Sequence, residues 1–254
     1  MRHYYAFLKK ELLESLRTFK LWIMLLIFAL FGVMNPLVAK LTPTLVESFL
    51  PLGDQVTIPD PTAFDSWGQF FKNINQMGTI ITLLIFSGVL ISELTKGTLI
   101  NVLTKGLSRK AVILAKFTAV ALIWTMSLSL SFLITLAYNS YLFPTDTVNH
   151  LVFSVLCIWL FGILLISILL FASTLTNTIY GSLIIVGGAF ILALLLNILP
   201  KLEKFNPLSL ATKNMDLLIG TIEPSDLLIA IGISLLLLVI FNLLAILIFN
   251  KKQI

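Results

Sequence analysis

Long uncharged hydrophobic runs alternate with short charged segments along this chain. Most of these runs approach the ~20 residues that a helix needs to cross the hydrocarbon core of a bilayer. The pattern therefore predicts an all-α integral membrane protein with one transmembrane domain over residues 1–254. Its six transmembrane helices are predicted at the following residues: about 21–39, 77–91, 117–137, 151–172, 179–199 and 227–249.

The segment before the first span has the pattern of an amphipathic helix. Apolar residues recur along one stripe, and charged residues occupy the rest of residues 4–20. The stripe comprises Tyr5, Leu8, Leu12, Leu16 and Phe19. We expect this helix to lie in the membrane interface, with its basic residues against anionic lipid.

A basic link joins the second and third spans, from Glu93 to Lys116. Within it, Leu99, Ile100 and Leu103 recur at helical spacing, which predicts a short helix parallel to the membrane. Gly106 stands where a glycine often follows a helix, and Ser108 could cap the next helix. The basic residues of the link are Lys96, Lys105, Arg109, Lys110 and Lys116.

The distribution of charge predicts the topology. Of the 17 Lys and Arg residues, 12 lie before the first span, in the link or after the last span. Basic residues gather on the cytoplasmic side of membrane proteins, so both termini and the link are predicted to be cytoplasmic. The longest outer segments are then residues 40–76 and 200–226.

Short surface helices are expected in both outer segments. Thr42-Pro43 and Asp60-Pro61 each pair a capping residue with a proline, which predicts two helix starts. The second helix would carry an aromatic stripe and lie on the outer interface, where the stripe favours an anchor over a substrate site, although in an exporter it could be both. The stripe comprises Phe64, Trp67, Phe70, Phe71 and Ile74. Residues 200–226 are expected to hold one or two further surface helices.

A polar ladder occupies one face of the third span. Ser127, Ser131 and Thr135 are spaced by four residues and share that face. They either line a translocation path or pack against another helix, and helix packing is the more common role of such residues.

Composition excludes several classes of function. With 58% hydrophobic and 11% charged residues, the chain cannot form a soluble domain. The net charge of +5 is spread beside span ends, which argues against nucleic-acid binding. A single cysteine, Cys157, excludes an intrachain disulfide and a cysteine-based metal site. No P-loop motif occurs, and no ionisable residue lies in the middle of a predicted span, which argues against an ion-coupled carrier.

Several segments together resemble known permeases. Glu93 to Gly97-Thr98, followed by an apolar turn, Ser108-Arg109 and Lys116, is similar to the intracellular loop of ABC exporter permeases of the type-2 (type V exporter) class. The run FLKKELLESLRTFKLW resembles the elbow helix before their first span. Asn35-Pro36 and Phe205-Asn206-Pro207-Leu208 also resemble segments of this family. Gly106 departs from the family pattern, in which a proline is expected two residues before the Ser-Arg pair.

The resemblance implies a cytoplasmic coupling helix, a separate ABC ATPase that binds ATP and Mg, and a second copy of this chain or a related permease. No cofactor is then expected in this chain. It also implies a cell (plasma) membrane location, in a bacterium. The residues implied to dock onto the ATPase are Lys96, Leu99, Ile100, Leu103, Lys105 and Arg109. Without the resemblance, these residues alone favour a solvated loop.

The function expected from this reasoning is a permease subunit of an ATP-driven exporter. The apolar spans suit an amphipathic or hydrophobic substrate, and we favour a peptide. The alternative is a non-transporting membrane anchor or sensor subunit of a signalling or immunity complex. An intramembrane hydrolase is disfavoured, because His3 and His150 fall on opposite sides of the membrane and no buried carboxylate pair accompanies either.

Overall fold

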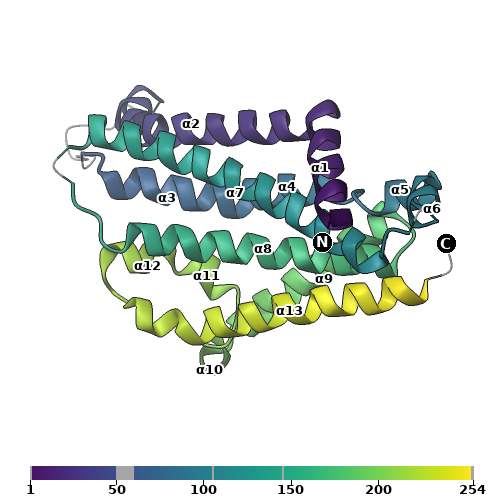
Figure 1. The fold of residues 1–254 in the computed structure, drawn as a ribbon. Coiled ribbons are helices and arrows are strands. Elements are labelled where there is room, and N and C mark those ends of the chain that lie inside the picture. The colour runs from purple at the N-terminus through teal and green to yellow at the C-terminus, as the bar shows by residue number, and fades with distance from the viewer. Residues whose placement is uncertain (1, 50–59, 105, 145, 253–254) are drawn as a thin grey trace.

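The chain folds into a bundle of helices (Figure 1). The computed structural model describes residues 2–49, 60–104, 106–144 and 146–252, and it contains no strand within those ranges. The helices in chain order are α1 (Arg2–Arg17), α2 (Lys20–Phe49), α3 (Ala63–Asn73), η1 (Ile74–Gly78), α4 (Thr79–Phe86), α5 (Ile91–Thr95), α6 (Thr98–Leu103), α7 (Arg109–Leu142), α8 (Leu151–Leu175), α9 (Ile179–Asn197), α10 (Pro200–Glu203), α11 (Ser209–Thr212), α12 (Asn214–Ile219), η2 (Pro224–Leu227) and α13 (Leu228–Lys251).

Six helical segments in the described part of the chain are long and apolar enough to cross a membrane, which confirms the predicted all-α class and the six spans. Each begins or ends within several residues of its prediction, except that the second is much longer. The six segments are Lys20–Thr44, Ala63–Thr95, Arg109–Leu142, Leu151–Leu175, Ile179–Asn197 and Pro224–Lys251.

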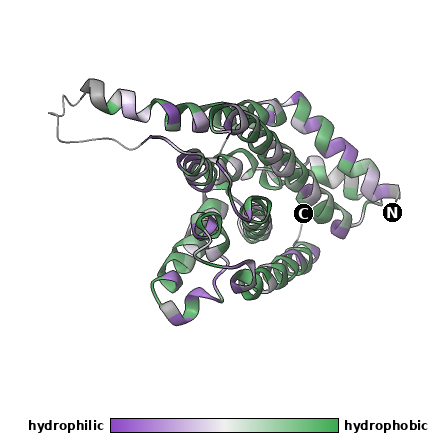
Figure 2. Cartoon of the chain, turned by 90° about the vertical axis from the view of Figure 1, so that its left-hand side faces the viewer, coloured by the Kyte–Doolittle hydropathy of each residue, from purple (hydrophilic) through white to green (hydrophobic). Residues whose placement is uncertain are grey.

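Helix α8 lies at the centre of the bundle. All ten residues from 161 to 170 are buried, and α2, α7, α9 and α13 contribute to the surrounding core. A helix that is hydrophobic on every side suits such a position, because each face meets another apolar helix. By contrast, α9 and α13 are largely exposed and would meet lipid. Figure 2 shows the bundle along its helices, with apolar residues dominating most of them.

The second span corrects the prediction for the aromatic stripe. Trp67, Phe70 and Ile74 are buried in the core, and the ring centroid of Trp67 lies 5.7 Å from that of Phe132 on α7. The helix that carries them runs on through η1 into α4, so the predicted helix on the outer interface is wrong. Its apolar face packs on protein, whereas we had assigned that face to lipid.

The helix start predicted at Thr42-Pro43 is also wrong. Helix α2 continues through Pro36 and Pro43 to Phe49. The Thr42 hydroxyl donates to the Val38 carbonyl at 2.6 Å, so it bonds back along the helix and does not cap a new one. The second predicted start lies close to α3, which begins at Ala63.

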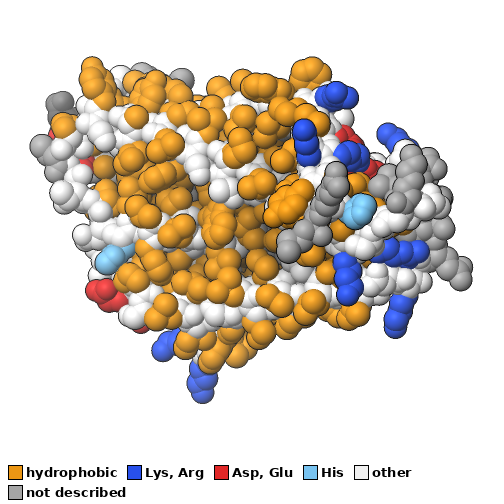
Figure 3. All heavy atoms as spheres, viewed as in Figure 1, with side chains coloured by type: hydrophobic (Ala, Val, Ile, Leu, Met, Phe, Trp, Pro, Cys, Tyr) orange, Lys and Arg blue, Asp and Glu red, His pale blue; other side chains and the backbone are white. Residues whose placement is uncertain are grey.

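The beginning of α1, the end of α13 and the helices α5 and α6 lie at the same end of the bundle, which we call the basic end (Figure 1). Lys and Arg side chains gather toward this end, and hydrophobic side chains cover most of the rest of the face in Figure 3. Helix α1 crosses the bundle there and turns into α2 at Phe19, whose φ is 61°. The basic residues near the two termini and in the link therefore also gather at one end of the folded bundle.

The long connection between α9 and α13 packs inward. We expected one or two surface helices in it, but α10, α11, α12 and η2 form there, and α11 and α12 contact α8. Leu210, Leu217 and Leu218 are completely buried. Their burial explains why the two short helices α11 and α12 cover the core at the end opposite the basic end.

Candidate functional site

The link between the second and third spans folds onto the basic end. Leu99 in α6 is only 1% exposed and packs in a cluster with Phe7, Leu107, Ile113 and Phe249. This side chain therefore holds the link against α1, α7 and α13. It presents no free surface to a docking partner.

The other predicted docking residues differ in their surroundings. Lys96 is exposed and Leu103 is half-buried. Ile100 lies in α6, but its side chain is outside the described part of the structure, as is the whole of Lys105. In the described part of the link, Lys96 and the outer side of Leu103 are thus the docking candidates that remain accessible.

Arg109 serves as a cap of α13. Its guanidinium donates to the carbonyl oxygens of Phe249 at 2.7 Å and Lys252 at 2.6 Å, and it lies over the Phe249 ring. The last carbonyl groups of a helix lack partners within the helix, and a cation there is favourable. Arg109 therefore ties the start of α7 to the end of α13.

The predicted ends of the two helices in the link are confirmed. Gly106 has a φ of +92°, a conformation that favours glycine. The Ser108 hydroxyl accepts a hydrogen bond from the Ala111 amide at 3.3 Å and caps α7. The link thus has a defined geometry even without the proline seen in the family pattern.

A buried ion-pair network lies beneath the link. Lys116 on α7 is 1% exposed, and its Nζ lies 2.9 Å from Glu11 of α1 and 2.7 Å from Glu93 of α5. It also donates to the Val89 carbonyl at 2.8 Å. The Lys116 ammonium group therefore joins α7 to α1 and α5.

Lys10 extends this network toward solvent. Its Nζ lies 3.1 Å from Glu11 and 2.6 Å from Glu14, and it also pairs with Glu93. Burial opposes the charged form of Lys10, but hydrogen bonds to Glu14 and Glu93 and the charge of Glu11 outweigh it and raise the Lys10 pKa. The ammonium group therefore stays charged at neutral pH.

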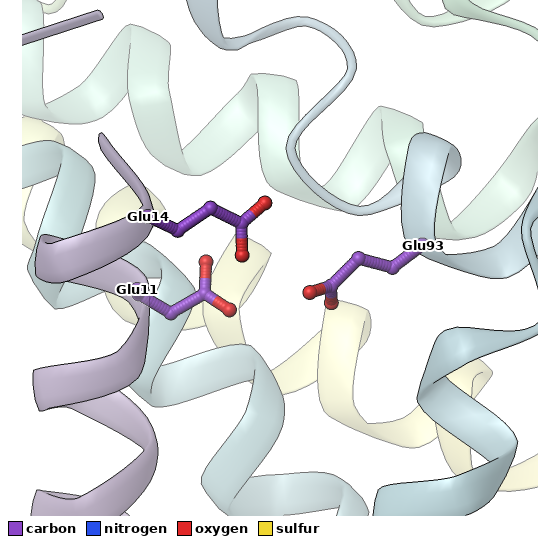
Figure 4. A group of neighbouring side chains, drawn as sticks. All are labelled: Glu11, Glu14 and Glu93. Carbon is purple, nitrogen blue, oxygen red and sulfur yellow. The ribbon is translucent and has the colours of Figure 1, made fainter. Parts of the chain in front are cut away.

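The three carboxylates converge, as Figure 4 shows, and such a group can hold a metal ion. Here Glu11, Glu14 and Glu93 already contact the ammonium groups of Lys10 and Lys116. The two lysines neutralise most of their charge, so the cluster is explained as an ion-pair network.

Sequence reasoning missed this network, although a signal was present. Phe7, Glu11 and Ser15 are spaced by four residues and form the buried face of α1. We had assigned the amphipathic helix to lipid through its apolar stripe. Tyr5 and Phe19 of that stripe are indeed exposed, but the polar Glu11 turns toward the protein.

The polar ladder of α7 faces α2. Ser127, Ser131 and Thr135 are completely buried, and the Thr135 hydroxyl donates to the Gly32 carbonyl at 3.2 Å. At Gly32 a Cβ would lie 3.0 Å from the Ser131 carbonyl oxygen, so the two helices approach closely there. This placement favours helix packing, and none of the three residues lines the cavity described next.

A cavity of about 770 Å³ opens between α3, η1, α4, α8, α9, α11 and α12. Its volume falls within the ~300–1,000 Å³ range of small-molecule sites. Most of its lining is apolar, with side chains such as Phe71, Leu83, Phe161, Val186 and Phe190. This cavity could not be predicted from the sequence, because no single span carries an unusual pattern at these positions.

The polar lining of the cavity gathers on α3, η1, α11 and α12. It comprises Lys72, Asn75, Gln76, Thr79, Thr212 and Asn214. The α4, α8 and α9 parts of the lining are entirely apolar apart from Thr79 at the start of α4, so the cavity has a polar region and an apolar region. Such a site suits a molecule that is itself amphipathic.

These features define a helical multi-pass membrane protein with a helix before the first span, a capped link and an internal cavity. A family model described as "ABC-2 family transporter protein" matches residues 5–254. The chain therefore belongs to the ABC-2 transporter permease family and is a transmembrane transport component. Permeases of this family normally work with an ABC ATPase. A search of curated proteins found no match.

Proposed function

We propose that the chain is the permease subunit of an ATP-driven exporter of amphipathic or hydrophobic molecules. The observation that carries this proposal is the cavity among the transmembrane helices, with its polar and apolar regions. A separate ATPase binds ATP and Mg, and two copies of the permease, or this chain and a related one, complete the transporter. A peptide, which the sequence favours, is one substrate of this kind.

The basic end supports the proposed coupling to the ATPase. In the proposal this end is cytoplasmic, in the cell membrane of a bacterium, and Lys96 and Leu103 meet the ATPase. Leu99 holds the link on the bundle, and Lys116 joins α5 to α7 and α1. Movement of the ATPase would therefore pass to the spans as a rigid-body movement.

The first experiment is purification of the tagged chain from its native membrane in mild detergent, with identification of its partners by mass spectrometry. We expect a P-loop ATPase in stoichiometric amount and ATP turnover by the complex. A chain that purifies without a nucleotide-binding partner would exclude the exporter. A partner whose turnover ignores every transported compound would instead favour the membrane-anchor alternative.

The docking surface is tested by Lys96→Glu. Reversal of this exposed charge should lower ATPase recovery several-fold without changing the folding of the chain, since charge pairs across an interface fix partner choice. Lys201→Glu is the matched control, because Lys201 is an exposed lysine in α10, away from the link. Equal ATPase recovery from both variants would exclude Lys96 from the interface.

A further inference from the structure

The cavity carries an unbalanced positive charge. Lys72 lines it, and no carboxylate does so among the described residues. In the described part of the chain, Lys72 also forms no ion pair, whereas Lys10, Lys116 and Lys213 each contact carboxylates. A lone ammonium group at the edge of an apolar cavity would attract an anionic group of a ligand.

Two buried amides stand behind the polar region of the cavity. Asn75 and Asn214 both line the cavity, and both side-chain NH₂ groups donate to the Ala211 carbonyl. Their Oδ1 atoms are buried and accept no hydrogen bond within the described structure. Since Asn214 is only 1% exposed and neither oxygen is open to a water-sized probe, the two amides lie behind the lining and hold η1 and α12 on the Ala211 carbonyl.

The rest of the lining accepts an alkyl chain. Its apolar side chains include Leu83 and Leu84 on α4, Leu165 on α8 and Leu183 on α9, and α8 reaches toward the basic end (Figure 1). Helices α3, α11 and α12 lie farther from that end than α4 does (Figure 1). The cavity therefore matches one molecule with an anionic head at Lys72 and an apolar tail along α4 and α9.

We propose that the cavity binds an anionic lipid-like amphiphile, with one acyl chain and a phosphate head. This proposal rests on the proposed function and narrows its substrate class. Lys72 selects the negative charge, and the apolar region holds the chain. A volume of about 770 Å³ is suited to one such molecule.

The charge preference is tested with the full chain in neutral maltoside detergent. The probes are lysophosphatidylglycerol, which has an anionic head, and lysophosphatidylcholine of the same chain length, which has a zwitterionic head. Native mass spectrometry measures the binding of each. Lys72→Gln should weaken binding of lysophosphatidylglycerol about three- to tenfold and leave lysophosphatidylcholine unchanged. Lys72→Arg should retain the preference, and Lys201→Gln is the control for an exposed lysine outside the cavity.

Occupancy of the cavity is tested separately with two neighbouring glycines. Gly187 lines the cavity and Gly188 does not, and a Cβ at either position meets nothing within 4 Å. Gly187→Phe should therefore fill the cavity and abolish the binding of both lipids, whereas Gly188→Phe should bind both as the parent chain does. The two substitutions have the same effect on helix propensity.

The outcomes separate this proposal from the proposed function. Loss of both lipids in Gly187→Phe, with selective loss of lysophosphatidylglycerol in Lys72→Gln, supports it. Loss of both lipids in Gly187→Phe without any effect of Lys72→Gln overturns the anionic class and leaves the cavity as a substrate site. Lipid binding that is indifferent to Gly187→Phe overturns the cavity as the lipid site. If the chain binds neither lipid but binds an uncharged hydrophobic peptide, and only Gly187→Phe abolishes that binding, the lipid class is overturned. The proposed exporter function then still stands.

Discussion

Replacement of Lys116 by methionine should weaken the basic end more than any exposed charge substitution there. The ammonium group is 1% exposed and contacts Glu11 and Glu93. Methionine preserves most of the apolar stem, but the cluster of two lysines and three glutamates changes from a net charge of −1 to −2. Removal of one partner from a buried ion pair costs about 3–5 kcal/mol. Because Lys10 still contacts both carboxylates, we expect the lower value, about 3 kcal/mol.

The assay is reversible unfolding by dodecyl sulfate in mixed micelles, followed by circular dichroism. Lys110→Met is the matched control, since Lys110 is exposed on the same helix and its loss should change the unfolding free energy by less than about 0.5 kcal/mol. Combination of Lys116→Met with Glu11→Gln and Glu93→Gln should recover part of the loss, because no unpaired buried charge then remains. If Lys116→Met is as stable as Lys110→Met, the network does not hold the basic end together and our reasoning is refuted.

Three further substitutions test other contacts of the fold. Gly162→Ala would place a Cβ 2.4 Å from the Trp124 ring and should lower the unfolding free energy by about 1–3 kcal/mol in the same micelle assay. Gly187→Ala is the control, because a Cβ there meets nothing within 4 Å and should not lower the unfolding free energy. Arg109→Gln should expose the last carbonyl groups of α13 and speed amide hydrogen exchange there; unchanged exchange would contradict the capping role. Asn242→Leu removes the hydrogen bond that the Asn242 amide on α13 donates to the Ser167 hydroxyl on α8. This loss should cost about 0.6 kcal/mol, up to ~1.7, in unfolding free energy, and a more stable variant would contradict this expectation.

Much of the fold could be predicted because it depends on local sequence. A run of apolar residues must be helical in lipid whatever its neighbours are, since its backbone groups can be satisfied only within the segment. The six spans, the positive φ at Gly106 and the cap at Ser108 follow from such local signals. The short helix of the link was found in the same way, through its spacing, whereas its docking role came from the family resemblance.

The partners of each helix face depended on the tertiary structure. A pattern shows which face of a membrane helix is apolar, but lipid and protein core are both apolar, so it does not show which of the two covers that face. For this reason Trp67 was assigned to the outer interface and is buried in the fold. Leu99 was assigned to the ATPase by the family resemblance, and it is also buried.

Charge pairing across the chain was hidden for a related reason. Lys116 was counted with the solvated lysines of the link, because a charge beside a span end is usually exposed to water. Only the packing of α1 over α7 brings Glu11 within 2.9 Å of it and removes both groups from water. The sequence by itself determined the all-α class and the six apolar spans of the described structure, through the solvation needs of the backbone. The tertiary structure decided the buried ion pairs and the cavity, because both form between segments that are distant in the sequence.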